Sequence, residues 1–247
     1  MAHILRHLIR AGAYLLLCWQ VSLFAQTAAP KESLAFTVYA VGQSPAWDKL
    51  YYLTGPKDAV KLSFRGNSRS AVLKAASAAK PLVFGVEQVD PATQQITYVP
   101  VAEAQWPDKA VKALLVFTAG SGPTGPQVQV TAVDDGTKAF PLRSVRIFNA
   151  TGVPLMAKVG EFEGTVTPGM SVSYPYHVQS EDPNKVGSFP LAFAFNDPAK
   201  GPILLHNGYA EAWPLGRALV FVLPPPQPGV MAVQLRTLVD APVVPKS

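Results

Sequence analysis

Residues that commonly carry chemistry are scarce in this chain, and the histidines are the first to consider. Only His177 and His206 lie beyond residue 25, and no HxH or HExxH spacing places a second ligand beside either one. The stretch YPYHV predicts that His177 lies on a strand face, whereas His206 precedes Asn207-Gly208, a turn signal. We therefore predict neither a metal site nor a bound cofactor.

Four acidic residues cluster loosely in the second half of the chain. Glu161 and Glu163 flank Phe162 in a predicted strand edge, while Glu181 and Asp182 lie in a loop. This arrangement is a weak candidate for the paired carboxylates of a glycosidase. The loop sequence SEDPN also lacks the spaced oxygen ligands of a dedicated calcium site.

The sequence around the candidate nucleophiles lacks the partner residues that catalysis would require. Neither histidine stands near a GxSxG-like turn, as a serine hydrolase of that type requires. The string GSG at 120–122 falls in a predicted hairpin, and no helix follows it to cradle a phosphate. Asn149-Ala150-Thr151 fits the glycosylation pattern but is interpreted as a turn. We predict no catalytic residue, and hence a protein that is not an enzyme.

Aromatic residues are the other candidates for ligand binding. Trp47, Tyr51 and Tyr52 fall in PAWDKLYYL. Carbohydrate-binding sandwiches present such rings to sugars, but rings of this kind are more often packed in the core or between domains. We favour burial and keep the sugar-binding interpretation as the alternative.

The first 25 residues have the layout of a secretory signal peptide. Arg6 and Arg10 form a positive segment, an apolar run extends from Ala11 to Phe24, and Ala25 offers a cleavage point, with Ala28 or Ala29 as the alternative. The apolar run is shorter than the ~20 residues of a spanning helix, so we expect no membrane span after cleavage. We predict export to the periplasm or the outside of a bacterial cell.

The composition of the chain excludes several further kinds of functional site. The only cysteine is Cys18, so the mature chain would have no disulfide, thiolate nucleophile, cysteine metal site or blue-copper centre. Without Arg6 and Arg10, 19 basic residues remain against 16 acidic ones. The bases over residues 57–80 are too loosely spaced for a nucleic-acid site, and we predict no nucleic-acid partner.

The chain contains the same passage twice. AEAQWPDKAVKALLVF at 102–117 matches AEAWPLGRALVFVL at 210–223, and from Lys112, which matches Arg217, the offset stays at 105 residues up to Asp135 and Asp240. The loops between the matching strands differ in sequence but not in length, as a conserved strand register requires. A unit of this size indicates domain duplication rather than a solenoid.

Each unit has the pattern of short β-strands. Val128, Val130 and Ala132 alternate with polar residues, as do Val233 and Leu235. The runs 114–117 and 219–223 are apolar throughout, which is typical of a central strand covered on both faces. Together with 24 prolines, the pattern predicts an all-β fold of two tandem immunoglobulin-like β-sandwiches.

We place the signal peptide at 1–25, the domains at 33–135 and 136–241, and a tail at 242–247. The linker is DDGTKAFP at 134–141, although the strand at 128–134 resembles an opening strand as well as a closing one. The segment 70–80 fits a helix or a strand followed by a loop.

The repeated hairpin supports further predictions. Pro107 and Pro214 end its first strand, because proline cannot donate to a ladder, and we expect the Trp rings beside them to plug the sandwich end. We also predict ion pairs across the hairpin, Glu103 with Lys112 and Glu211 with Arg217, each contributing about 0.2–1 kcal/mol.

Three functional hypotheses follow. The leading one is a non-enzymatic exported envelope protein, a structural or binding module whose partner is another envelope protein or a cell-surface polysaccharide. The second is a periplasmic assembly factor that binds client strands. In layout alone, two immunoglobulin-like domains after an export signal, the chain broadly resembles the periplasmic pilus chaperones, but its halves match each other and theirs do not. The third is a carbohydrate-binding or hydrolytic accessory domain.

Overall fold

The computed structural model describes residues 33–55, 58–66, 68–122, 125–178, 180, 182, 185–225, 227 and 229–241. The predicted signal peptide with its alternative cleavage points, Cys18, Glu181 and the tail at 242–247 lie outside these residues. From Leu34 onward the chain forms one compact unit.

The described residues form an all-β structure that fits a β-sandwich, with a single 3₁₀ turn, η1 (Trp47–Lys49), and no α-helix. Within this part of the chain, no helix is long and apolar enough to cross a membrane. The segment 70–80 holds the short strand β4 (Leu73–Lys74) followed by a loop, so the strand alternative for this segment is confirmed and the helix is wrong.

The strands of the first half occupy residues up to 134. They are β1 (Ala35–Val41), β2 (Leu50–Leu53), β3 (Ala59–Lys61), β4, β5 (Leu82–Val89), β6 (Ile96–Ala104), β7 (Lys112–Gly122) and β8 (Gly125–Asp134).

The strands of the second half begin at residue 144. They are β9 (Ser144–Asn149), β10 (Leu155–Val159), β11 (Phe162–Val166), β12 (Gly169–Met170), β13 (Tyr174–Pro175), β14 (Gly187–Asp197), β15 (Gly201–Ala212), β16 (Arg217–Leu223) and β17 (Gln234–Asp240).

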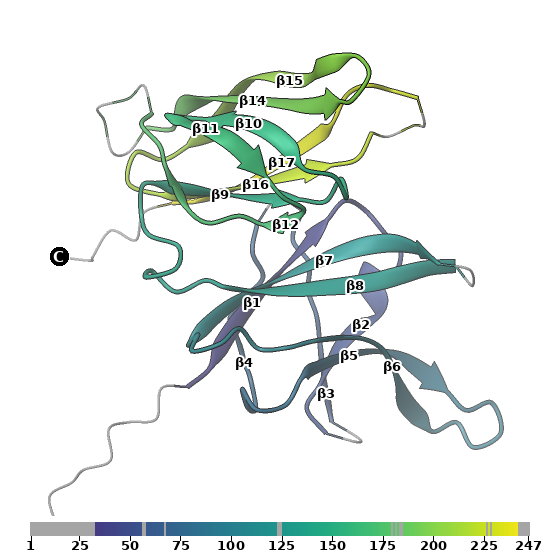
Figure 1. Ribbon diagram of the computed structural model, residues 1–247. Helices are drawn as coiled ribbons and strands as arrows, with labels where there is room; N and C mark the ends of the chain where they lie inside the picture. Colours follow the sequence, from purple (N-terminus) through teal and green to yellow (C-terminus); the bar gives the residue numbers. More distant parts are fainter. Residues whose placement is uncertain are drawn as a thin grey trace, which may run out of the picture. The chain divides into compact units, whose positions relative to one another are not determined.

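Each half contains two sheets with the same strand order (Figure 1). The inner sheets are β4-β1-β7-β8 and β12-β9-β16-β17, and the outer sheets are β3-β2-β5-β6 and β11-β10-β14-β15. The short strand β13 also pairs with β9. The strand at 128–134 belongs to β8, which pairs with β7 of the first half.

The pairing registers of the two halves also agree. β1 runs parallel to β7 and β9 runs parallel to β16. In the neighbouring hairpins, Leu114 faces Val133 and Leu219 faces Leu238, so the predicted offset of 105 residues holds across both strands. Because Ala40 faces Phe117 and Asn149 faces Val222, the same register makes Ala40 and Asn149 equivalent positions.

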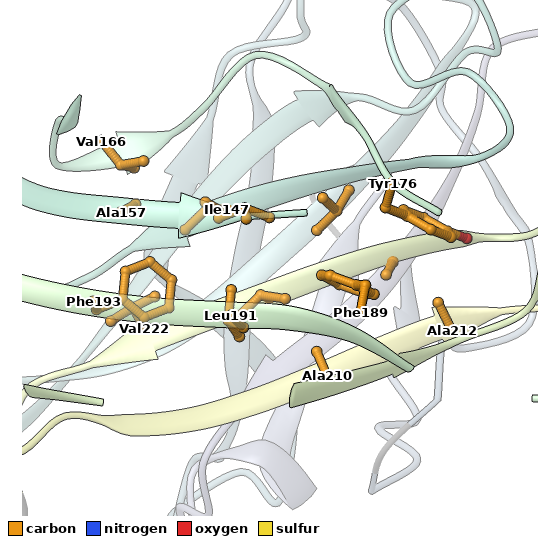
Figure 2. Packing of buried hydrophobic residues seen from close by; sticks show 14 of the residues in the cluster. Ile147, Ala157, Val166, Tyr176, Phe189, Leu191, Phe193, Ala210, Ala212 and Val222 are labelled. Carbon is orange, nitrogen blue, oxygen red and sulfur yellow. The ribbon is translucent and has the colours of Figure 1, made fainter. Parts of the chain in front are cut away.

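Buried side chains gather in three cores. The first-half core lies between the two sheets of the first half, and the second-half core between those of the second (Figure 2). A third, shared core joins the two inner sheets and consists of Tyr39, Val41, Leu114, Val116, Val133, Phe140, Phe148, Leu219, Phe221 and Leu238.

The shared core explains the strands that are apolar throughout. Along β7, Leu115 faces the first-half core while Leu114 and Val116 face the shared core. Along β16, Val220 faces the second-half core while Leu219 faces the shared core. The prediction of central strands covered on both faces is confirmed, and the second cover is the inner sheet of the other half.

The edge strands alternate as predicted. Val128, Val130 and Ala132 pack against the first-half core while Gln129 and Thr131 are exposed. In the other half, Val233 and Leu235 pack against the second-half core, whereas Arg236 is exposed.

The predicted hairpin ion pairs are wrong. Glu103 and Glu211 are exposed on the outer sheets, and neither forms an ion pair with Lys112 or Arg217, which begin strands of the inner sheets. Arg217 instead binds two aspartates, described below. The strands on either side of each Trp-Pro step therefore belong to different sheets rather than to one hairpin.

The two Trp-Pro steps also differ in packing. Trp106 is buried in the first-half core, and its Nε1–H donates to the carbonyl of Ala110 at 2.7 Å. Trp213 is only half-buried, and its carbonyl accepts the hydroxyl of Tyr176, which packs in the second-half core. The expected plug is confirmed for Trp106 alone.

Candidate functional site

The structure separates the two histidines. His177 is exposed, with its Nε2 3.5 Å from the carboxylate of Glu161, and it follows β13 rather than lying within a strand. His206 lies inside β15, so the predicted turn at Asn207-Gly208 is wrong. Gly208 leaves room for the imidazole of His206, since a Cβ at position 208 would lie 3.2 Å from Nε2.

Other candidates from the sequence have structural explanations. Glu163 is exposed on β11, and the residues at 120–122 are the last of β7. Asn149 is 2% exposed, and its amide donates to the carbonyls of Val153 and Val166, so this side chain forms a turn and is not presented as a glycosylation acceptor. Among the described residues, no three His, Cys, Asp or Glu side chains come together in a way that would hold a metal.

The aromatic cluster is divided between core and surface. Trp47 and Tyr52 are buried in the first-half core, as favoured, while Tyr51 lies half-buried on the outer sheet with its hydroxyl 2.8 Å from Glu87. Trp47, however, also borders a hollow at one end of the first half.

This hollow has a volume of ≈ 540 Å³. The rings of Trp47 and Phe64 line it, with their centroids 5.6 Å apart, and the polar side chains of Gln43, Asp48 and Arg65 surround them. The size falls within the ~300–1,000 Å³ of small-molecule sites. We take this hollow as the candidate binding site.

Local turns form its walls. After β1, Gly42 adopts φ +80°, a conformation that favours glycine, and the Ser44 carbonyl accepts the N–H of Trp47 to start η1. Beside Arg65, which also lines the hollow, the N–H of Ser68 donates to the Arg65 carbonyl at 3.1 Å. Trp47 is fixed by a hydrogen bond from Nε1 to the Gly42 carbonyl at 3.3 Å.

The second half carries a hydrogen-bonded link at the equivalent position. Asn149 links the segment after β9 to the end of β11, because its amide donates to Val153 at 2.8 Å and to Val166 at 3.1 Å. In the first half the equivalent residue is Ala40, which borders the hollow and carries no group that could bridge its walls. The two halves therefore differ at this position, with an alanine beside a hollow in the first and an asparagine that links two segments in the second.

A second concentration of polar side chains lies where the inner sheets meet. Arg69 binds both oxygens of Asp240 at 2.7 Å and Asp135 at 3.0 Å, while Arg217 binds Asp240 at 3.0 Å. All four side chains are between 12% and 18% exposed. Arg217 also lies over the ring of Phe140, 4.7 Å from its centroid.

The electrostatics of this cluster favour a structural role. Burial raises the pKa of Asp135, against the opposing charges of Arg69 and Arg217. Desolvation of buried ion pairs commonly offsets their attraction, so such clusters fix geometry more than they add net stability. The cluster joins the halves: Arg69 and Asp135 belong to the first half, and Arg217 and Asp240 to the second.

Sequence reasoning identified neither feature as a site. The repeat did align Asp135 with Asp240 and Lys112 with Arg217, but it gave no sign that Arg69 would lie beside them. For the hollow, the available signal was the contrast between Ala40 and Asn149, which becomes visible only once strand pairing has made these positions equivalent.

Comparison with known protein families and curated proteins found no match. No family model matches the chain, and no curated protein matches it either.

Proposed function

We propose that this protein is an exported, non-enzymatic binding module built from two duplicated immunoglobulin-like sandwiches, with its ligand site in the hollow beside Trp47. The partner would be a cell-surface polysaccharide or another envelope protein. Export is supported by the basic and apolar pattern of residues 1–25.

Duplication is supported at two levels. The sequence offset of 105 residues recurs in the strand pairs, and the order of strands is the same in both halves. A serine contact is repeated as well. Ser70 Oγ accepts the N–H of Val38 at 2.9 Å, and Ser171 Oγ accepts the N–H of Ile147 at 2.9 Å, at equivalent positions of β1 and β9.

The immunoglobulin-like interpretation rests on strand neighbours. An immunoglobulin fold places strands A, B, E and D in one sheet and C, F and G in the other. Strands β1, β2, β4, β5 and β6 have the neighbours of B, C, E, F and G, and β3 extends the second sheet beside β2. The place of strand A beside β1 is taken by β7, which runs parallel to β1.

The observation that carries the binding function is the open end of the first half. The two halves differ there, because Ala40 borders a hollow whereas Asn149, at the equivalent position, links two segments by hydrogen bonds. Binding is favoured over glycoside hydrolysis because the lining supplies Asp48 as its carboxylate, whereas that reaction uses two.

A retention assay tests this function. The mature chain is incubated with insoluble envelope material from its own host, and the bound fraction is measured for the wild type and for Ala40→Asn, which copies the second half. Asp108→Ala is the matched control, since Asp108 is 89% exposed and remote from the hollow lining. We expect Ala40→Asn to reduce retention and Asp108→Ala to preserve it.

Two results would contradict the proposal. Equal retention of wild type and Ala40→Asn would show that the hollow does not take part in binding. Recovery of the tagged full-length chain in the cytoplasm, with residues 1–25 still attached, would show that the protein is not exported.

A second candidate function is capture of a client strand, favoured by β15. This strand has 12 residues and lies at the end of its sheet, and no strand among the described residues pairs with its outer edge. It exposes Leu204 (60%) and Tyr209 (67%). Exposed edges of this kind accept an added strand.

Site-specific photocrosslinking in the native host separates this candidate from binding in the hollow. Strand capture predicts a discrete crosslinked product from position 209 and none from position 172, where Val172 is 71% exposed outside that edge. Crosslinks from position 48 alone would favour the hollow.

A further inference from the structure

We infer that the hollow beside Trp47 takes an uncharged saccharide, one or two sugar rings of a larger glycan or a free sugar. This inference rests on the proposed binding function and names its ligand class.

The floor of the hollow offers a fixed aromatic surface. Phe64 is half-buried and packs edge-on against Phe117, 5.1 Å between centroids, so its orientation is set by the core. Trp47 is 7% exposed and is held by its hydrogen bond to Gly42. The half-buried ring of Phe64, backed by the buried ring of Trp47, suits the apolar C–H face of a sugar, because a ring held in place loses little conformational entropy on contact.

The rim supplies hydrogen bonds of both kinds. Asp48 accepts, Arg65 donates, and the amide of Gln43 does both, which matches hydroxyl groups that are donors and acceptors at once. All three side chains are exposed, and none has an ion pair or hydrogen-bonded partner among the described residues. They are therefore available to a ligand.

The charges of the rim argue against a strongly ionic ligand. One carboxylate and one guanidinium border the same hollow, so an anion would meet Asp48 and a cation would meet Arg65. A neutral polyhydroxyl compound meets neither penalty. The volume of ≈ 540 Å³ fits one or two sugar rings better than a folded protein surface.

Saturation-transfer NMR on the mature chain tests the ligand class. The probes are maltopentaose, cellopentaose and chitopentaose, and the indole N–H signal of Trp47 reports contact with the hollow. We expect at least one probe to receive saturation and to shift the Trp47 signal. Asp48→Ala and Arg65→Ala are expected to weaken that binding by about tenfold each, the loss typical of one charge-assisted hydrogen bond. Asp108→Ala is expected to leave it unchanged.

Failure of this inference differs from failure of the proposed function. If retention on envelope material depends on Ala40 but no probe perturbs Trp47, and protease treatment of the envelope abolishes retention, the ligand is a protein and the saccharide class is wrong. If a probe binds equally to wild type, Asp48→Ala and Arg65→Ala, the hollow is not where it binds. Both outcomes overturn the inference.

Discussion

Arg69 is the side chain whose loss should disturb the junction of the halves most. It contacts Asp240 at 2.7 Å and Asp135 at 3.0 Å, so its removal leaves two buried carboxylates with Arg217 alone. Breaking a buried pair by removing one partner costs about 3–5 kcal/mol. We expect Arg69→Met to lower the free energy of unfolding by about 3 kcal/mol.

Urea denaturation measures this effect, with Lys112→Met as the control. Lys112 is exposed at the position equivalent to Arg217, and its replacement should change stability by no more than about 0.5 kcal/mol. Similar losses for the two variants would show that the cluster does not join the halves as described.

Tyr176 should make stability fall at high pH. Burial, together with the charge of Asp240, raises its pKa to about 12. Because the folded-state pKa lies above the unfolded value near 10, the contribution is fully present below pH ~10 and is lost as pH rises through ~12. A shift of this size corresponds to about 2–3 kcal/mol.

Comparison with Tyr176→Phe isolates this residue. Near neutral pH the variant should be less stable by about 1 kcal/mol, because it loses the hydrogen bond to the Trp213 carbonyl. At pH ~11.5 the order should reverse, because only the wild type has a buried phenol to ionise. Tyr209→Phe, at a side chain that is 67% exposed, should show no reversal. A constant difference between wild type and Tyr176→Phe across this range would contradict the argument.

At the scale of elements, the paired serines should be equivalent anchors. Ser70 holds β1 and Ser171 holds β9, each by accepting a strand N–H and donating to the next carbonyl. Replacing either by alanine leaves a donor of Val38 or Ile147 unpaired, which costs about 1–2 kcal/mol.

Chemical denaturation of Ser70→Ala and Ser171→Ala tests this equivalence, and Ser63→Ala, at an exposed serine, is the control. Equal losses for the first two variants and none for the control are expected. A loss confined to one half would mean that the repeated contact is not an inherited anchor.

The elements also show what local sequence could predict. The run 114–117 is apolar at every position, so burial on both faces followed from its composition alone, and the ungapped match to 219–223 predicted an equal register. The Asn207-Gly208 signal misled, because cross-strand pairing with β14 overrode a local turn preference. The pairing of Arg69 with Asp240 spans 171 residues, and no local pattern encodes such a contact.

The candidate site was less accessible to sequence reasoning than the fold. Trp47 drew attention as an aromatic, but burial in the core was the favoured interpretation and is correct for its ring. At Ala40 the first half lacks the amide by which Asn149 links two segments of the second half, and the loops that form the walls of the hollow differ in length from those of the second half. This difference becomes evident only when the two halves are compared at positions that strand pairing makes equivalent.

For the whole molecule, the shared core should make the two halves unfold together. Leu114 and Val116 from β7 meet Leu219 and Phe221 from β16 in this core, so neither inner sheet is covered without the other. Separation of the halves would expose apolar surface on both, and that cost couples their stabilities.

Substitutions in different cores test this coupling. Leu219→Ala in the shared core should cost about 2–5 kcal/mol and reduce amide hydrogen-exchange protection in β7 as well as in β16. Leu191→Ala removes a similar side chain from the second-half core. It should first increase amide hydrogen exchange in β10 and β14, through partial unfolding of these paired strands. The amides of β7 should stay protected until the whole protein unfolds. If Leu219→Ala left β7 protection at the wild-type level while β16 lost it, the halves would be independent, and the shared core would be a contact without energetic coupling.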